Sequence, residues 1–215
     1  MTPKLAQAVD PIFIHVLDLL ERVKNDQQPS PQEERLRIRA LIDQAEAILG
    51  GGPEWELSKY AIVSWIDEML VDMPWSGQEW WANNVMEVEL FNTRVCSEEF
   101  FLKAQEASTG SNRDALEVFY VCVVLGFRGL YHDPHSAEMI ARPHGLPTDL
   151  ETWAKQTSMS IRLGQGRPPL PPPTHEITGA PPLRTRELVF WPWLVASMLL
   201  AINAIVFWFQ WKLGG

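Results

Sequence analysis

Two adjacent acidic residues in a largely apolar segment are the first candidates for chemistry in this 215-residue sequence. Asp67 and Glu68 have the residue types of a general acid and a general base, since many enzymes use paired carboxylates in these roles. On a helix, however, adjacent side chains point about 100° apart, which suits a surface patch better than two carboxylates converging on one bond. The sequence therefore predicts no catalytic residue at this pair.

Histidines, cysteines and glycines supply the other candidates. The stretch 132–144 contains three histidines, but a zinc site needs further ligands that the sequence does not clearly supply, so we expect these histidines to lie in a loop. Cys96 and Cys122 lack a nucleophile motif, and although a bridge between them is not excluded, nothing in the sequence demands it. Gly50-Gly51-Gly52 lacks the Lys-Ser/Thr that follows in a phosphate-binding loop and indicates a helix end. Gly126 and Gly129 likewise indicate a helix end. We expect no metal and no cofactor.

The helix expected to carry the acidic pair runs from about Glu54 to Met73. One of its sides is apolar, and the other interleaves acids with aromatic residues, which a plain solvated face would not do. Two interpretations stay open: the helix is mostly buried and its acids pair with nearby Arg or Lys, or the acids line a groove that receives a partner. The candidate partner-binding residues are Tyr60, Ser64, Trp65, Asp67, Glu68 and Asp72.

The elements around this helix also have helical periodicity. No stretch of residues 1–166 alternates with a period of two for long enough to predict a sheet, whereas apolar residues recur at helical spacing. The expected helices cover Lys4 to Lys24, Pro31 to Ile48, Glu54 to Met73, Trp81 to Phe91, Ser97 to Ala107, a segment capped by Asn112 that includes the stripe Leu116 to Phe127, and Pro147 to Ile161. The predicted fold class is all-α, with a body of about six to eight helices.

Charge is distributed unevenly along the chain. Acids outnumber bases 27 to 18, which argues against a general nucleic-acid binder. The run from Leu188 to Trp211 has no formal charge, and as a helix it would span about 36 Å, enough for a bilayer core of about 30 Å. Tryptophans lie near both ends, as in the aromatic belts of membrane spans: Trp191, Trp193, Trp208 and Trp211. The run is predicted to be a membrane anchor.

The flanks of this run predict its orientation. Arg184 and Arg186 precede it and Lys212 follows it, so the positive-inside rule puts residues 1–187 in the cytoplasm and the C-terminus in the periplasm. Asn203, near mid-span, is a candidate for contact with a partner helix in the membrane. The expected domains are a helical body over 1–166, a proline-rich linker over 167–187, the anchor over 188–211 and a periplasmic tail over 212–215.

Five segments in the helical body resemble, in the right order, the TssL (DotU/IcmH) family of type VI and type IV secretion systems. The resemblance covers about residues 10–165, and the anchor after them is similar to the family as well. The segments are Lys59 to Glu68, Pro74-Trp75-Ser76-Gly77, Leu90-Phe91-Asn92-Thr93, Glu98-Glu99-Phe100-Phe101, and Phe119 to Tyr131.

The resemblance implies a function. Family members are non-enzymatic parts of an inner-membrane complex, with a cytoplasmic body of two packed helical bundles and a cleft between them. The resemblance implies a TssM (IcmF)-like membrane protein and baseplate proteins of the TssK type as partners, and it leaves a homodimer open. Asp67 and Glu68 match acids of the family pattern at the docking cleft.

The sequence also departs from the family. Many relatives have an acid where Arg128 stands and a basic residue where Leu130 stands, and many have Asn-Thr in place of Asp72-Met73. Some relatives carry a peptidoglycan-binding domain beyond the anchor, and here we expect any such activity to be supplied by another protein. The alternatives are a tail-anchored hydrolase that uses the same acidic groove and a related type IV secretion accessory protein.

Overall fold

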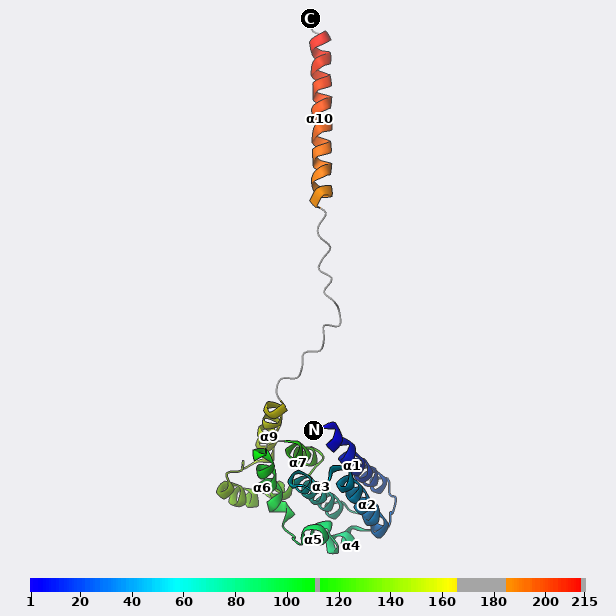
Figure 1. The fold of residues 1–215 in the computed structure, drawn as a ribbon, viewed down its shortest axis with the longest axis vertical. Helices are drawn as coiled ribbons and strands as arrows, with labels where there is room; N and C mark the ends of the chain where they lie inside the picture. Colours follow the sequence, from blue (N-terminus) through cyan, green and yellow to red (C-terminus); the bar gives the residue numbers. More distant parts are fainter. Residues whose placement is uncertain (111–112, 166–184, 214–215) are drawn as a thin grey trace. The chain divides into compact units, whose positions relative to one another are not determined.

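The computed structural model describes residues 1–110, 113–165 and 185–213, and every regular element in these ranges is a helix (Figure 1). The all-α prediction is therefore confirmed. The chain divides into two units, Met1–Pro168 and Pro169–Gly215. The first unit contains α1 (Pro3–Lys24), α2 (Pro31–Leu49), α3 (Pro53–Asp72), α4 (Gln78–Asn83), α5 (Met86–Phe91), α6 (Cys96–Thr109), α7 (Asp114–Val124), η1 (Gly129–His132), α8 (Pro134–Ala141), η2 (Arg142–His144) and α9 (Leu150–Gln165), and the second contains α10 (Thr185–Leu213).

Helices α1 and α2 pack against each other, and each begins at a hydroxyl cap followed by proline. Thr2 accepts a hydrogen bond from the backbone N–H of the third residue of α1, and Ser30 does the same at the start of α2. The buried carboxylate of Glu34 on α2 accepts from Arg22 of α1 at 3.3 Å and contacts the His15 ring at 2.9 Å. Its charge is thus compensated across the pair of helices.

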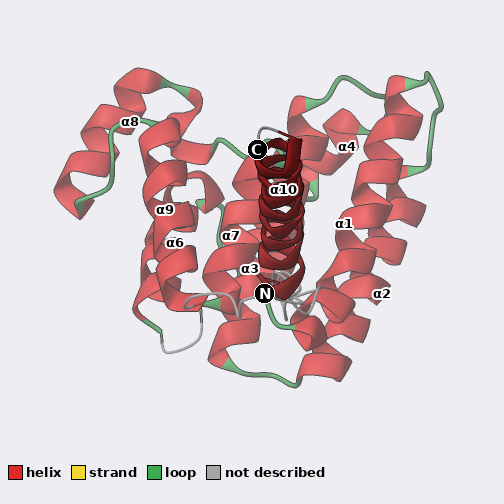
Figure 2. Cartoon of the chain, turned by 90° about the horizontal axis from the view of Figure 1, so that it is seen from above, coloured by secondary structure: helices red, strands yellow, loops and turns green. Residues whose placement is uncertain are grey.

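Helix α3 is the centre of the body. It packs against α7, α4, α5 and α6, and Trp65 at its middle contacts the ring of Phe13 on α1 at 5.2 Å between centroids. Figure 2 shows α3 and α7 between the pair α1 and α2 on one side and α6 and α9 on the other. This is the arrangement of two helical groups that we expected. Because neighbours cover α3 on several sides, its residues from Ser58 to Asp67 are all buried.

The segment after α3 forms two short helices where the sequence predicted one from Trp81 to Phe91. Helix α4 ends at Asn83, and α5 begins at Met86. Asn84 closes α4 with its backbone N–H bonded to the carbonyl of Trp81, and the first N–H groups of α5 donate to Asp67 on α3. A distant carboxylate therefore starts the second helix, a cap that no local pattern could predict.

Aromatic side chains form the core on the far side of α3. Phe100 of α6 stacks on Phe127 at 3.9 Å between ring centroids and meets Phe119 of α7 edge-on at 4.8 Å. Phe101 meets Trp153 of α9 edge-on at 5.1 Å. These contacts fix α6, α7 and α9 as one packed group.

Two details of this half differ from the sequence prediction. The expected cap of α7, Asn112, lies outside the described residues, and α7 begins at Asp114. The stretch 132–144, expected to be a loop, forms α8 and η2 after η1, so its three histidines lie in separate short helices. Gly126 follows α7 with a φ of +116° and ends the helix, as its position in the sequence predicted.

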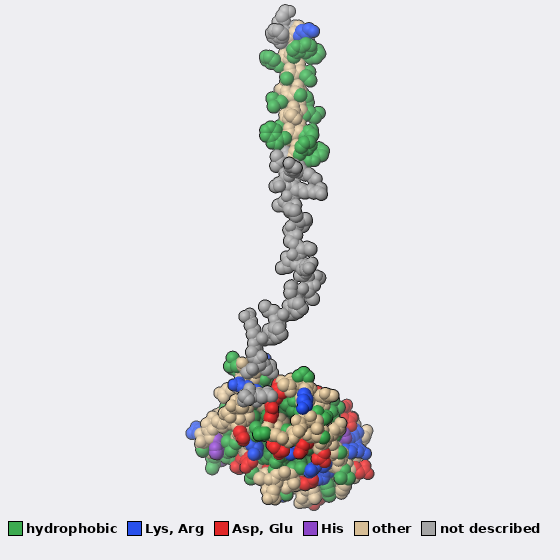
Figure 3. Space-filling model, in the orientation of Figure 1, with side chains coloured by type: hydrophobic (Ala, Val, Ile, Leu, Met, Phe, Trp, Pro, Cys, Tyr) green, Lys and Arg blue, Asp and Glu red, His purple; other side chains and the backbone are tan. Residues whose placement is uncertain are grey.

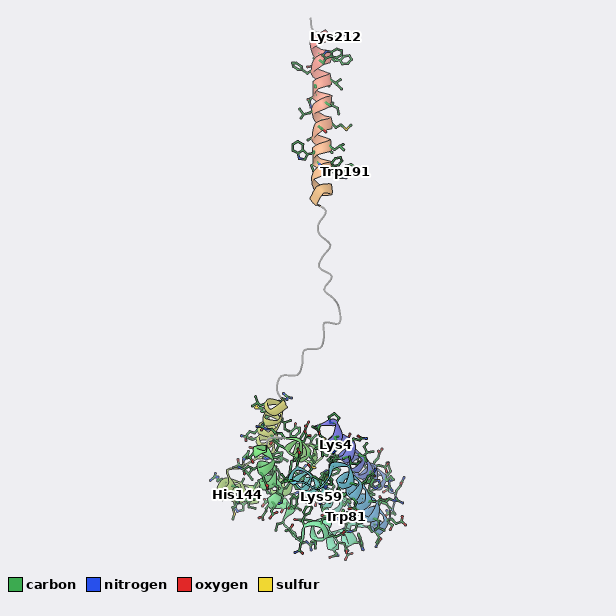
Figure 4. The ribbon with its side chains drawn as sticks, viewed as in Figure 1. Lys4, Lys59, Trp81, His144, Trp191 and Lys212 are labelled. Carbon is green, nitrogen blue, oxygen red and sulfur yellow. The ribbon has the colours of Figure 1, made fainter. Side chains whose placement is uncertain are left out.

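Helix α10 is apolar around its whole circumference. Within the described residues, two segments are long and apolar enough to span a membrane: Asp114–His132, half of which is buried in the body, and Phe190–Gln210, of which nothing is buried. Figure 4 labels Trp191 and Lys212 near the two ends of α10, and Figure 3 shows hydrophobic side chains along it. The helix begins at Thr185, three residues inside the predicted linker, and the rest of that linker (167–184) lies outside the described residues.

Candidate functional site

Asp67 lies on the polar side of α3, yet its side chain is only 3% exposed. Its Oδ1 accepts hydrogen bonds from Trp81 Nε1 and from the backbone N–H of Met86, both at 2.9 Å. Its Oδ2 accepts from the backbone N–H of Glu87 at 2.8 Å. Burial raises the pKa of Asp67 to about 6, although the three N–H donors act in the opposite direction.

Glu68 points to a different part of the body. Its Oε1 accepts from the backbone N–H of Arg128 at 2.6 Å, and its Oε2 accepts from that of Gly129 at 2.9 Å. The carboxylate thus bridges α3 and the turn that leads from α7 into η1. Burial raises the pKa of Glu68, and the same two backbone donors oppose that shift.

A pocket of about 230 Å³ lies beside these two acids. We call it the α3 pocket, and its lining consists of Asp67, Glu68, Val71, Asp72, Ala82, Val85, Glu87, Arg94, Cys96 and Ser97. Asp72 is exposed at the end of α3, and Arg94 is the lining cation. The pocket is therefore strongly acidic, with four carboxylates and one guanidinium.

The carboxylate of Glu87, another lining residue of the α3 pocket, is 2% exposed. Its Oε1 accepts from Tyr60 Oη at 3.2 Å, from Thr93 Oγ1 at 2.8 Å and from the backbone N–H of Val95 at 3.0 Å. All three donors are neutral, so the charge is solvated by the protein without being neutralised. Burial, together with the Glu87 charge, raises the pKa of the Cys96 thiol and makes it a poor nucleophile at neutral pH.

None of the four pocket carboxylates forms a salt bridge among the described residues. Lys59, the basic residue of α3, pairs with Glu46 and Glu56 instead, at 3.2 and 2.8 Å. Arg94 donates to the carbonyl of Ala82 at 2.7 Å. The interpretation in which Asp67 and Glu68 pair with Arg or Lys is therefore wrong, because their partners are N–H groups.

The predicted partner-binding residues have unequal access to the surface. Tyr60, Ser64 and Trp65 are 2%, 0% and 0% exposed, so they have almost no surface with which to touch another protein. Trp65 donates its indole N–H to the carbonyl of Leu125 at 3.4 Å. Any part that these three residues play in docking is indirect, through the packing of α3.

Sequence reasoning missed seven of the ten lining residues of the α3 pocket, among them the charged Glu87 and Arg94 and the thiol of Cys96. Glu87 looks like an ordinary first-turn acid of a surface helix, and its burial arises only because α5 packs against α3. The one available signal was its position near Leu90-Phe91-Asn92-Thr93, a segment of the family resemblance.

An all-α body with an acid-lined pocket, together with an apolar helix long enough to span a bilayer, indicates a membrane-associated scaffold protein rather than a soluble one. The model of the family "Type VI secretion system protein DotU" matches residues 4–212. The chain therefore belongs to the DotU family and is a structural, inner-membrane component of the type VI secretion system.

A solved structure has the same fold. The cytoplasmic domain of TssL from Acinetobacter baumannii is similar at 22% sequence identity and a TM-score of 0.59, over 74% of this chain and 98% of that one. A comparison with curated proteins finds no match. The resemblance predicted from the five sequence segments is confirmed.

Proposed function

We propose that this protein is a non-enzymatic subunit that holds the cytoplasmic baseplate of the secretion system to the inner membrane. The observation that carries the proposal is the α3 pocket, which four carboxylates line without a salt bridge among the described residues. Uncompensated charge in a concave surface attracts a partner of opposite charge and speeds its association. The docking partner is a baseplate protein of the TssK type that presents a basic surface.

The membrane half of the proposal rests on α10. According to this proposal, residues 188–211 span the inner membrane once, the N-terminal body is cytoplasmic and the C-terminus is periplasmic. The arginines at 184 and 186 before the span, against Lys212 after it, support this orientation. A TssM (IcmF)-like protein is the partner in the membrane, and a homodimer through α10 is the alternative contact.

Mid-span Asn203 is the polar group that such a contact would use. Its amide nitrogen donates to the carbonyl of Leu199 at 3.1 Å within α10, which leaves the amide oxygen as an acceptor for a neighbouring helix.

The geometry of the acids in the α3 pocket supports docking over catalysis. Both oxygens of Asp67 and of Glu68 accept N–H groups of the protein itself, and the two carboxylates are directed at different segments of the body rather than at one reacting bond.

A charge-reversal experiment tests the docking proposal. We expect Asp72→Lys in the full chain, reconstituted in lipid nanodiscs, to weaken binding of the purified TssK-type protein by about tenfold or more, because it reverses an exposed pocket charge. Glu106→Lys is the matched control, since Glu106 is an exposed acid on α6 outside the α3 pocket. Equal losses in the two variants, or no loss in either, would contradict a docking role for the pocket.

A further inference from the structure

Two neighbouring acids of α3 bind different segments of the body. Asp67 accepts N–H groups from α4 and α5, through Trp81, Met86 and Glu87. Glu68 accepts N–H groups from the turn before η1, through Arg128 and Gly129. Because consecutive side chains on a helix diverge by about 100°, these two adjacent residues of α3 can bind two different segments of the body.

The groups held by Asp67 form one wall of the α3 pocket. Ala82 lies in α4 directly after Trp81, and Val85 lies directly before Met86, so the bonds of Asp67 fix the backbone on both sides of the break between the two helices. The buried Glu87, whose N–H Asp67 accepts, is itself part of the lining. The position of this wall therefore depends on one carboxylate.

The groups held by Glu68 support a second wall, at the start of α6. Gly129 lies so close to the start of α6 that a Cβ on it would stand 2.9 Å from the carbonyl oxygen of Ser97. Ser97 lines the α3 pocket, next to Cys96. Glu68 thus positions the turn before η1, which packs closely against the N-terminal end of α6. Glu87 holds the same end through the backbone N–H of Val95.

We propose that Asp67 and Glu68 are positioning residues that hold the two walls of the α3 pocket, and that the exposed Asp72 makes the charged contact with the docking protein. This inference rests on the proposed docking function, and it assigns different roles to acids that look equivalent in the sequence. Both oxygens of Asp67 and of Glu68 accept the protein's own N–H groups, whereas the exposed carboxylate of Asp72 remains available to a partner.

Amide hydrogen exchange in the full chain, without any partner, tests the positioning role. Asp67→Asn should accelerate exchange at Met86 and Glu87, and Glu68→Gln should accelerate it at Arg128 and Gly129, because each amide side chain replaces one acceptor oxygen with an NH₂ group. The matched control Asp72→Asn should leave all four amides unchanged. If Asp67→Asn does not fold, Trp81→Phe removes one donor to the same carboxylate and should accelerate exchange at Met86. Unchanged exchange in these variants overturns the proposal.

Binding kinetics against ionic strength test the division of roles, with the TssK-type baseplate protein as the probe. Asp72→Asn should lower the association rate and flatten its salt dependence, as expected for an exposed contact charge. Asp67→Asn and Glu68→Gln should instead raise the dissociation rate severalfold with the salt dependence of wild type, a split that a loss of overall stability would not produce.

The two arms separate the possible failures. Flattened salt dependence in Asp67→Asn or Glu68→Gln would make these acids direct contacts and overturn the inference. Absence of binding by the wild-type chain would overturn the docking function, and with it the contact role of Asp72, while the exchange experiment still decides whether the two acids hold the walls.

Discussion

The carboxylates of Asp67 and Glu68 accept N–H groups and form no salt bridge among the described residues, and the burial of Asp67 has a consequence for the pH dependence of stability. Burial raises the pKa of Asp67 from 3.8 to about 6. Because the folded protein then binds this proton more tightly than the unfolded chain, the free energy of unfolding should rise as the pH falls from about 6 towards 4.

The variant Asp67→Asn makes this effect measurable, since its side chain does not titrate. In urea titrations between pH 7 and pH 4, wild type should gain stability relative to Asp67→Asn as the pH falls, by about 3 kcal/mol at most. Asp10→Asn, at an exposed acid of α1, is the control for the general effect of losing one carboxylate. A difference between wild type and Asp67→Asn that is constant across this range would mean that the Asp67 carboxyl does not change its protonation there.

Residue roles on α3 were predictable only in part. The interleaving of acids with Tyr60 and Trp65 correctly indicated that the polar side of this helix is not a plain solvated face. The periodicity could not indicate that other helices also cover that side, so it did not distinguish the buried Asp67 from the exposed Asp72. The hydrogen-bond donors of Asp67 come from positions 14 to 20 residues later in the chain, and only the tertiary fold brings them there.

At the scale of elements, the long helices were predictable and the short ones were not. The limits of α1, α2 and α3 lie within a few residues of those expected, because each helix begins with proline and carries many apolar residues at helical spacing. The break between α4 and α5 depends on Asp67, and α8 begins at Pro134, a residue equally compatible with a loop. Short helices of six to eight residues are fixed by tertiary contacts more than by their own sequence.

The junction between α7 and η1 offers a test of how elements are held together. Gly129 has a φ of +48°, and a Cβ there would lie 2.8 Å from Phe127 Cε1 and 2.9 Å from the Ser97 carbonyl oxygen. We expect Gly129→Ala to cost about 1–3 kcal/mol of stability and to lower Tm by several degrees in thermal unfolding followed by circular dichroism.

Gly51→Ala is the matched control for this substitution. Gly51 lies between α2 and α3, its φ is not positive, and a Cβ on it would meet nothing within 4 Å. This variant should unfold at the wild-type temperature. If Gly129→Ala does so as well, the junction relaxes freely and the close approach to Ser97 does not constrain the end of α6.

At the scale of the whole molecule, the separation of charge and hydrophobicity was the strongest signal in the sequence. Every acid precedes Leu188, and the described part of α10 has apolar side chains along its length, whereas acidic and basic side chains are scattered over the face of the body that Figure 3 shows. The anchor was predictable because a membrane span depends on composition alone. The α3 pocket was not, because it is formed by segments from four parts of the chain.

Removal of the apolar run tests this division of the molecule. A chain that lacks residues 188–215 should remain folded and soluble, because the core of the body contains no residue of α10. It should show the helical circular dichroism of the body, unfold cooperatively, and move from the membrane pellet to the supernatant on ultracentrifugation. Replacing 188–211 with an unrelated membrane span of equal length is the control, and this chimera should return to the pellet. An aggregated or unfolded truncated chain would instead mean that α10 contributes to the core of the body, and the run would then be a buried helix rather than an anchor.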